Sequence, residues 1–225
     1  MPGIYKNIGH LYIKQEQFDL AEIEYEKSKQ WESHCDFSPI DKAAYAIGRG
    51  DLYVRTEKYS LARQELQEAE HLLREYAGPK NPNYVYIYAN RGDMSIKEGK
   101  LDSALIFTQK ALAGLSYTYQ EEDIENNPDF HSVISKPLLL GLLEYKGNLC
   151  EKIYESNPDN ISYLELGLST YLDGFDLIDT MRMNFLQLLS KEYLSESVLP
   201  MFESAIGTCM ACLLYTSDAA DESVC

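Results

Sequence analysis

The chain begins its main pattern with Tyr5-Lys-Asn-Ile-Gly-His-Leu-Tyr12 and repeats that pattern twice. The second copy is centred on Gly50 and the third on Gly92. Matching residues stand four positions before each glycine and 3, 9, 12, 16 and 19 positions after it. A fixed internal period of this kind is the signature of a repeat architecture. The copies are, in order, Tyr5, Gly9, Tyr12, Phe18, Ala21, Tyr25, Ser28; Ala46, Gly50, Tyr53, Tyr59, Ala62, Leu66, Ala69; and Tyr88, Gly92, Ser95, Leu101, Ala104, Thr108, Ala111.

Each copy places a glycine in a first helix and an alanine in a second helix. Glycine inside a helix costs about 1 kcal/mol relative to alanine, so it needs a reason to be there. A second helix that crosses at roughly 8–10 Å supplies that reason, because it leaves no room for a side chain. The spacing predicts an all-α fold of antiparallel helix pairs. The alternative, an ordinary bundle that happens to repeat small residues, is disfavoured because three copies keep the same register.

The three copies resemble the tetratricopeptide repeat, with small residues at the helix crossing and aromatic residues beside them. The resemblance covers residues 4–116 and implies a right-handed solenoid of helix pairs that binds other proteins. It says almost nothing about the ligand. The copies depart from the family in two ways. They recur about every 41–42 residues instead of 34, and Ser95 stands where the family has an aromatic residue.

We divide the chain into four segments: three helix pairs in residues 1–116, an acidic linker in 117–130, a divergent helical hairpin with a following helix in 131–210, and a tail in 211–225. Ser38 and Pro39 are typical of a helix start, and the Gly- and Pro-containing residues 77–83 break the helix before the third copy. The acidic linker lacks the carboxylate spacing and the glycine of a calcium loop, so we expect a solvated segment. We expect the later helices at residues 135–154, 161–185 and 186–207, with Ser195 as a cap inside the last.

A second resemblance lies in residues 174–205. The order of Gly174–Arg182 and Ser190–Ala205, including Leu199-Pro-Met-Phe202, is similar to the segment that links tetratricopeptide repeats to a caspase-like CHAT domain in large bacterial proteins. That resemblance implies an N-terminal scaffold whose peptidase-like domain lies downstream and is missing here.

Both ends of the chain suggest a fragment. Residues 212–222 resemble the in-frame translation of a transposase-type sequencing adaptor, so we leave residues 211–225 out of the expected fold. The first repeat begins at the N-terminus without a capping repeat, so Met1 is expected to be an internal methionine. A solenoid cut in this way exposes an apolar end, and we expect self-association through Leu186–Phe202.

The amino-acid composition and net charge disfavour several classes of protein. The formal charge of −16, from 36 acidic and 20 basic residues, disfavours nucleic-acid binding. The longest apolar run, Pro137–Leu143, is far too short to span a bilayer, and the N-terminus carries no secretory signal. Five cysteines without a CxxC pair argue against a zinc site or a disulfide framework. We expect a cytoplasmic protein that binds no membrane and holds no metal or cofactor.

We expect no catalysis from these residues. The four histidines are scattered, and His34 and Cys35 are neighbours in sequence, whereas catalytic dyads are assembled from distant segments. Two Arg-Gly-Asp tripeptides, at 49–51 and 91–93, contain the crossing glycines and are therefore expected to lie in helices instead of adhesion loops.

Because we expect no catalytic residues, the candidate functional feature is a surface. Stacked helix pairs line a concave groove with their first helices. In this groove we expect an apolar ladder of Ile13, Val54 and Ile96 beside an acidic pair, Asp51 and Asp93, which would suit a partner with Lys or Arg next to an aliphatic residue. The alternative is that this face packs on another part of the parent protein. The nine groove residues are Lys6, His10, Ile13, Ile47, Asp51, Val54, Ala89, Asp93 and Ile96.

Three functions fit this sequence. The first is a non-catalytic protein-interaction scaffold, the N-terminal part of a CHAT-type protein. The second is a peptide-sensing regulatory module that controls an output domain, and the third is a free-standing adaptor.

Overall fold

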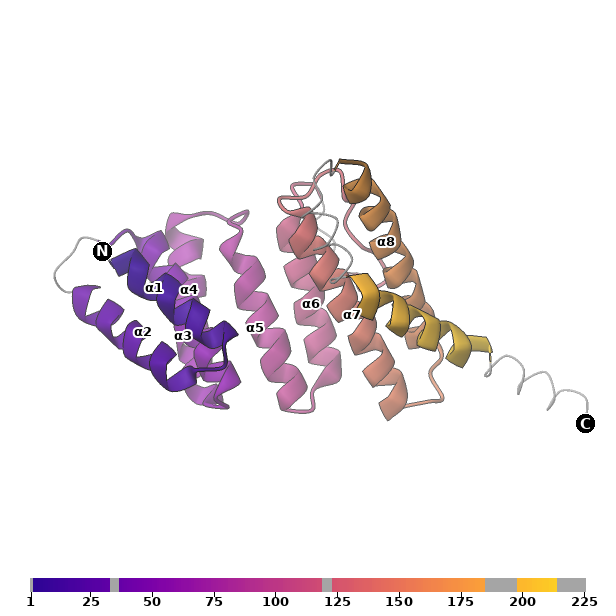
Figure 1. Ribbon diagram of the computed structural model, residues 1–225, viewed down its shortest axis with the longest axis horizontal. Coiled ribbons are helices and arrows are strands. Elements are labelled where there is room, and N and C mark those ends of the chain that lie inside the picture. Colours follow the sequence, from indigo (N-terminus) through magenta and orange to yellow (C-terminus); the bar gives the residue numbers. More distant parts are fainter. Residues whose placement is uncertain (1, 33–36, 119–122, 185–197, 214–225) are drawn as a thin grey trace, which may run out of the picture. The chain divides into compact units, whose positions relative to one another are not determined.

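The computed structural model describes residues 2–32, 37–118, 123–184 and 198–213, and all regular elements in these ranges are helices (Figure 1). The chain divides into two compact units, Met1–Glu98 and Gly99–Cys225, which are described separately. The helices are α1 (Pro2–Lys14), α2 (Phe18–Glu32), α3 (Pro39–Arg55), α4 (Tyr59–Tyr76), α5 (Asn83–Lys97), α6 (Leu101–Leu115), α7 (Lys136–Ser156), α8 (Ser162–Asn184) and a C-terminal helix over residues 198–213.

The first unit consists of sequential antiparallel pairs, as the repeat predicts. Helix α1 packs on α2 and α3 packs on α4, while α5 packs on both α3 and α4. A Cβ atom added to Gly50 would lie 2.8 Å from Leu66, and one added to Gly9 would lie 3.0 Å from the ring of Tyr25. Ala21 and Ala62 on the second helices are fully buried. The small residues therefore mark helix crossings, which confirms that part of the sequence prediction.

Local signals set the ends of these helices. Ser38 caps α3 by accepting a hydrogen bond from the Asp41 amide at 3.1 Å, and Pro39 occupies the first turn, where no amide donor is needed. The turn inside each of the first three copies contains one residue with positive φ, seven positions after the crossing glycine. These residues are Glu16 (57°), Glu57 (59°) and Gly99 (73°). A recurring left-handed residue shows that the repeat fixes the turns as well as the helices.

The second unit is built on the α7/α8 pair, and α6 packs on α7. The ring of Tyr171 on α8 fills the space that a side chain at Gly147 on α7 would need. Gly167, Tyr171 and Gly174 keep the 0, 4, 7 spacing of Ala21, Tyr25 and Ser28. They lie 20, 24 and 27 positions after Gly147, against 12, 16 and 19 in the earlier copies. The hairpin that we predicted to be divergent thus keeps part of the repeat spacing, with eight extra residues between its glycine and the matching positions of α8.

The C-terminal helix packs on this pair. Met201 is buried and occupies the space over Gly174, and the rings of Phe175 and Phe202 stack with centroids 4.2 Å apart. The helix runs to residue 213, so residues 211–213, which we predicted to lie in the tail, are helical. Residues 214–225, together with residues 186–197 and the predicted Ser195 cap, lie outside the described residues.

The described part of the acidic linker is fixed against the helices, which differs from the solvated segment that we expected. Ser116 and Val133 form an antiparallel bridge that closes the loop at its base. The buried amide of Gln109 on α6 donates to the backbone carbonyls of Asp123 and Asn126, both at 2.7 Å. Gln109 is fully buried and must find partners, so the loop backbone is held even though the side chains of Asp123 and Asn126 are exposed.

Candidate functional site

The nine predicted groove residues all lie in the first unit, but three of them belong to its core. Ile13 is 1% exposed, Val54 is 4% exposed and Ile47 is 8% exposed. Ile13 packs with Tyr25 and Ile47 packs in the cluster around Leu66. These three side chains are not available to a partner, so the apolar ladder does not exist as a surface.

The reason lies in helix geometry. Ile13 and Val54 each follow a crossing glycine by four residues, and residues four apart share one face of a helix. The face that carries Gly9 and Gly50 is turned toward the second helix of the pair. In these two pairs the residue four positions later packs against that helix too, as Val54 does against Ala62. Ile96 stands at the same spacing from Gly92 but is partly exposed.

The other residues of α1 and α3 form a mixed-charge face instead of an acidic one. The Nε atom of Arg55 donates to Asp51 Oδ1 at 3.2 Å, so a cation one turn away balances that carboxylate. Burial lowers the pKa of His10, while the nearby carboxylate of Asp51 opposes the shift. Lys6 places its Nζ 5.7 Å from the ring centroid of Tyr45. The charges on this face are therefore partly neutralised by contacts within the chain itself.

Helix α5 carries the remaining predicted residues on one stripe. Ala89, Asp93 and Ile96 are all partly exposed, and the half-exposed Tyr86 continues the stripe at helical spacing. This stripe combines apolar side chains with one carboxylate. It is the part of the predicted groove in which an aliphatic side chain and an acid remain side by side.

The two Arg-Gly-Asp tripeptides lie inside α3 and α5, as predicted, and their arginines bind other helices. Arg49 is buried and its Nη2 lies 2.7 Å from Glu65 Oε2 on α4. Arg91 Nη2 lies 2.7 Å from Glu70 Oε2, also on α4. Both side chains hold helices together, so neither tripeptide presents an adhesion motif.

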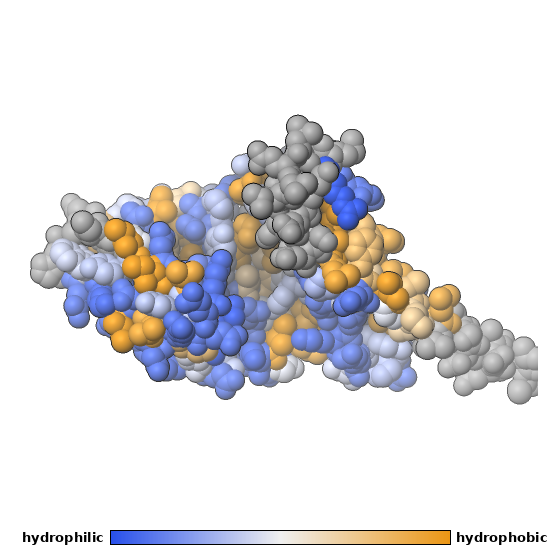
Figure 2. All heavy atoms as spheres, in the orientation of Figure 1, coloured by the Kyte–Doolittle hydropathy of each residue, from blue (hydrophilic) through white to orange (hydrophobic). Residues whose placement is uncertain are grey.

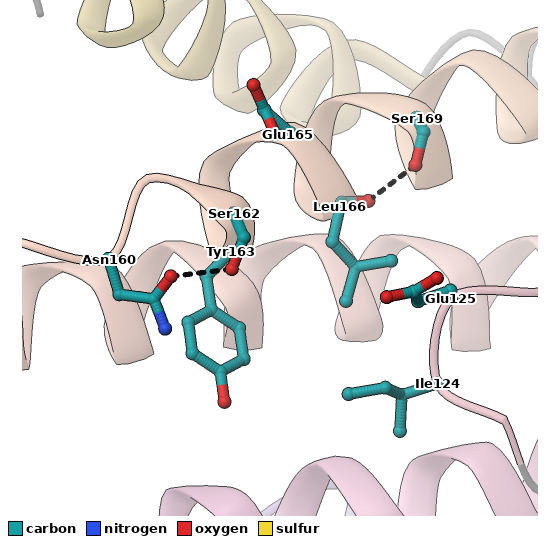
Figure 3. Close-up of a pocket in the computed structure, with 8 residues that line it drawn as sticks. All are labelled: Ile124, Glu125, Asn160, Ser162, Tyr163, Glu165, Leu166 and Ser169. Atoms are coloured by element: carbon teal, nitrogen blue, oxygen red, sulfur yellow. Dashed lines mark hydrogen bonds between the residues drawn. The ribbon is translucent and has the colours of Figure 1, made fainter.

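A pocket of about 470 Å³ lies in the second unit, and the sequence did not predict it. Figure 3 shows Ile124 and Glu125 on the loop before α7, with Tyr163 and Leu166 reaching toward them from α8. The carboxylate of Glu165 points away from these side chains. The remaining lining residues are Asn160, Ser162 and Ser169.

The two serine hydroxyls of this pocket already make hydrogen bonds within the chain. Ser162 Oγ donates to Asn160 Oδ1 at 2.6 Å, and Ser169 Oγ donates to the carbonyl of Leu166 at 2.9 Å. The lining thus combines the apolar side chains of Ile124 and Leu166 and the ring of Tyr163 with two carboxylates, Glu125 and Glu165.

Lys146 on α7 holds the loop that forms one wall of the pocket. This fully buried amine donates to Gln109 Oε1 at 3.0 Å, to Asn127 Oδ1 at 2.8 Å and to the carbonyl of Asn126 at 3.4 Å. Burial lowers the pKa of Lys146 to about 8, against the opposing fields of Cys150, Asp173 and Asp123. The amine is thus a structural cation whose partners are all neutral.

The sequence contained a signal for Lys146 that we did not use. A basic residue stands immediately before the crossing glycine in three copies, as Arg49, Arg91 and Lys146. All three side chains bind acceptors on a neighbouring segment of their own unit.

Two features of the described residues concern metal binding and cysteine reactivity. Among these residues, no group of three or more His, Cys, Asp or Glu side chains is placed to hold a metal ion. Burial raises the pKa of Cys150 to about 12, which keeps this thiol protonated and unreactive. His34 and Cys35 lie outside the described residues. No helix of the described chain is long and apolar enough to cross a membrane.

Comparison with known proteins supports the repeat. The model of the tetratricopeptide repeat family matches residues 2–35, which contain α1 and α2. No curated protein and no solved structure matches the chain. A tetratricopeptide repeat is typical of proteins that bind other proteins, and it is the part of the fold that these comparisons recognise.

Proposed function

We propose that this chain is a non-catalytic protein-interaction scaffold whose first helices bind an extended peptide of a protein partner. One observation supports this most directly. The partly and fully exposed residues of α1, α3 and α5 combine the ion pair of Asp51 and Arg55, beside His10, with the apolar and acidic stripe that contains Asp93 and Ile96. Such a face recognises charge and aliphatic carbon together, and it holds no reactive group.

The chemistry of this face favours a peptide with Lys or Arg next to an aliphatic residue. Asp51 and Asp93 supply the negative charge, and Ile96 with Tyr86 supplies apolar contact. Because Arg55 already binds Asp51, a cationic peptide has to compete with that guanidinium. Removing Arg55 should therefore strengthen binding, while removing the carboxylates should weaken it.

Peptide selection on the full chain tests this proposal. A phage-displayed library of random twelve-residue peptides is selected, and the enriched peptide is titrated by fluorescence anisotropy. We expect enrichment of a basic residue next to an aliphatic one. Asp51→Ala with Asp93→Ala should weaken binding at least tenfold, and Arg55→Ala should tighten it. Glu68→Ala, which removes an exposed carboxylate on α4, is the matched control and should leave the affinity unchanged.

Two results would overturn the proposal. One is the enrichment of peptides with no basic residue. The other is an affinity that the double variant leaves as it was while circular dichroism shows the same helix content as the parent chain.

We further propose that this scaffold belongs to a CHAT-type caspase-like bacterial protein. The support is the resemblance of residues 174–205, whose cluster at 199–202 takes part in the fold through Met201 and Phe202. Long-read sequencing of the gene beyond the codon of Gly207 tests this. An open frame that encodes a His- and Cys-containing α/β segment supports it, and a stop codon within a helix length refutes it. A different output domain would instead favour the peptide-sensing regulatory module.

A further inference from the structure

The pocket in the second unit lies between two acidic elements. The loop residues 123–130 contain three acidic residues and no basic one. Helix α8 contains four acidic residues and one basic residue, Arg182. No Lys or Arg stands among the residues that line the space between them. A cleft whose walls carry one sign of charge attracts ions of the opposite sign, so the pocket favours a cation.

The pocket also offers apolar contacts. Ile124 on the loop lies across from Tyr163 and Leu166 on α8, and all three side chains are partly exposed (Figure 3). The volume of about 470 Å³ lies within the range of about 300–1,000 Å³ that is usual for ligand pockets. On the face of the second unit drawn in Figure 2, hydrophobic and hydrophilic side chains also lie next to one another. A ligand that suits this pocket therefore combines apolar carbon with positive charge.

Negative charge lies directly beside these apolar side chains. The carboxylate of Glu125 extends toward Leu166, whereas that of Glu165 points away and adds charge only at longer range (Figure 3). Burial raises the pKa of the Tyr163 hydroxyl, and the carboxylate of Asp102 on α6 adds to this shift, so the ring also lies in a negative field. Each of these charges stabilises a cation in the pocket.

The wall that carries Glu125 is fixed in place by buried groups. The side chains of Gln109 and Lys146 both donate to the carbonyl of Asn126, the residue after Glu125. The amide of Glu125 itself donates to Asp123 Oδ1 at 3.0 Å. Lys146 is fully buried and is not a lining residue, so its charge does not occupy the pocket. A wall that is already ordered lowers the entropy cost of binding.

We propose that this pocket binds the side chain of a lysine or arginine residue of a partner protein. The aliphatic stem of that side chain packs on Ile124 and Leu166, and its charged end reaches Glu125. The ring of Tyr163 adds a cation–π contact, which a neutral side chain does not make. An acidic side chain is repelled by both walls, and a purely apolar one leaves Glu125 without water or a partner. The lining residues all belong to the second unit, so this inference does not rest on the peptide-binding face of the first unit.

Methyl-detected NMR on the full chain, with Ile and Leu methyl groups labelled, tests this pocket. The probes are lysine and arginine with both backbone ends blocked as amides. Each should move the methyl signals of Ile124 and Leu166 in a saturable way. Blocked norleucine, which keeps the aliphatic stem of lysine without its charge, should bind about tenfold more weakly. Blocked glutamate should cause no shift.

Variants of the chain identify the carboxylate that meets the cation. Glu125→Gln removes the charge with little change in shape, so it should weaken binding of the lysine probe about tenfold and leave that of norleucine as it was. Glu155→Gln, at an exposed position of α7 outside the pocket, is the matched control and should bind like the parent chain. Asp51→Ala with Asp93→Ala should also leave these shifts unchanged, which separates this pocket from the peptide-binding face.

Three outcomes overturn the inference. The absence of a saturable shift at Ile124 and Leu166 with both basic probes shows that the pocket does not take a basic side chain. Equal binding of the lysine and norleucine probes shows that charge is not recognised. Unchanged lysine binding in Glu125→Gln, with the other methyl signals as in the parent chain, shows that Glu125 is not the partner of the cation.

Discussion

The hydroxyl of Tyr25 occupies the space where a side chain at Gly48 would begin. A Cβ atom added to Gly48 would lie 2.5 Å from that oxygen and 2.9 Å from Cε1 of the same ring. Gly48 lies on α3 and Tyr25 on α2, so this contact joins the first helix pair to the second. The other edge of the ring covers Gly9 on α1. One aromatic side chain thus sets the approach of three helices in the first unit.

Gly48→Ala should destabilise the chain. The added methyl group has to displace the buried ring of Tyr25, and overpacking of this kind costs about 1–3 kcal/mol. Alanine recovers up to about 1 kcal/mol of helix propensity, so we expect a net loss. Thermal unfolding followed by circular dichroism measures it. Gly141→Ala on α7 is the matched control, because nothing lies within 4 Å of its added Cβ. That variant should be unchanged or more stable, and equal losses in both would contradict the packing argument.

Tyr25→Phe should leave stability unchanged or raise it. The Tyr25 hydroxyl is buried and has no hydrogen-bond partner among the described residues, and burial raises its pKa. Phenylalanine keeps the ring over Gly9 and removes an unsatisfied polar atom, whose burial costs about 1–3 kcal/mol. The midpoint of urea unfolding reports the change. A clear loss of stability would mean that the hydroxyl has a partner that contributes to the fold.

Gly99 and Glu57 are turn residues with positive φ at equivalent positions of the repeat. Substitutions at these two positions should change stability by different amounts, and in opposite directions. Gly99 has a φ of 73°, and no atom crowds its missing Cβ. Gly99→Ala should therefore cost only the backbone strain, about 1 kcal/mol. Glu57 adopts nearly the same φ of 59°, so Glu57→Gly should relieve strain, partly offset by the greater entropy of the unfolded chain. Melting temperatures of both variants check this. A loss in Glu57→Gly as large as that in Gly99→Ala would contradict it.

The sequence predicted the fold well wherever the repeat keeps its spacing. Around Gly9 and Gly50 the pairs, their crossings and the cap at Ser38 followed from residue types alone. Around Gly147 we predicted only a divergent hairpin, because eight extra residues separate this glycine from the matching positions that begin at Gly167. Only the spacing of Gly167, Tyr171 and Gly174 inside α8 is kept after that insertion. Three small or aromatic residues, without a glycine at the expected distance before them, are too weak a pattern to identify a repeat.

The candidate site was predicted less well. The spacing of residues in the sequence shows which face of a helix a side chain lies on, but it does not show which element packs against that face. Ile13 and Val54 lie on the face of their crossing glycines, so they entered the core. The charge of Asp51 is balanced by Arg55 one turn later, a pairing that the residue list contained and that we did not weigh. The pocket depends on the loop that Lys146 holds from 19 or more residues away, and local periodicity cannot report such a contact.

The buried amine of Lys146 makes stability depend on pH in a definite direction. Its pKa falls from 10.5 to about 8 on folding, so between pH 8 and 10.5 the unfolded chain binds more protons than the folded chain. Stability contributed by this group therefore rises with pH across that window and is constant below it. A shift of this size corresponds to about 3 kcal/mol in total.

The comparison of the parent chain with Lys146→Met isolates this effect. Unfolding midpoints are measured from pH 7 to pH 10 for both proteins. Other titrating groups contribute alike and cancel in the difference, including Cys150, whose pKa of about 12 keeps it protonated. At pH 7 the variant loses the donor to Gln109 and Asn127 but also the cost of a buried charge. As pH rises, the parent should therefore gain stability relative to the variant. Parallel pH profiles would show that folding does not lower the pKa of Lys146, and the buried amine could not be the source of the pH dependence.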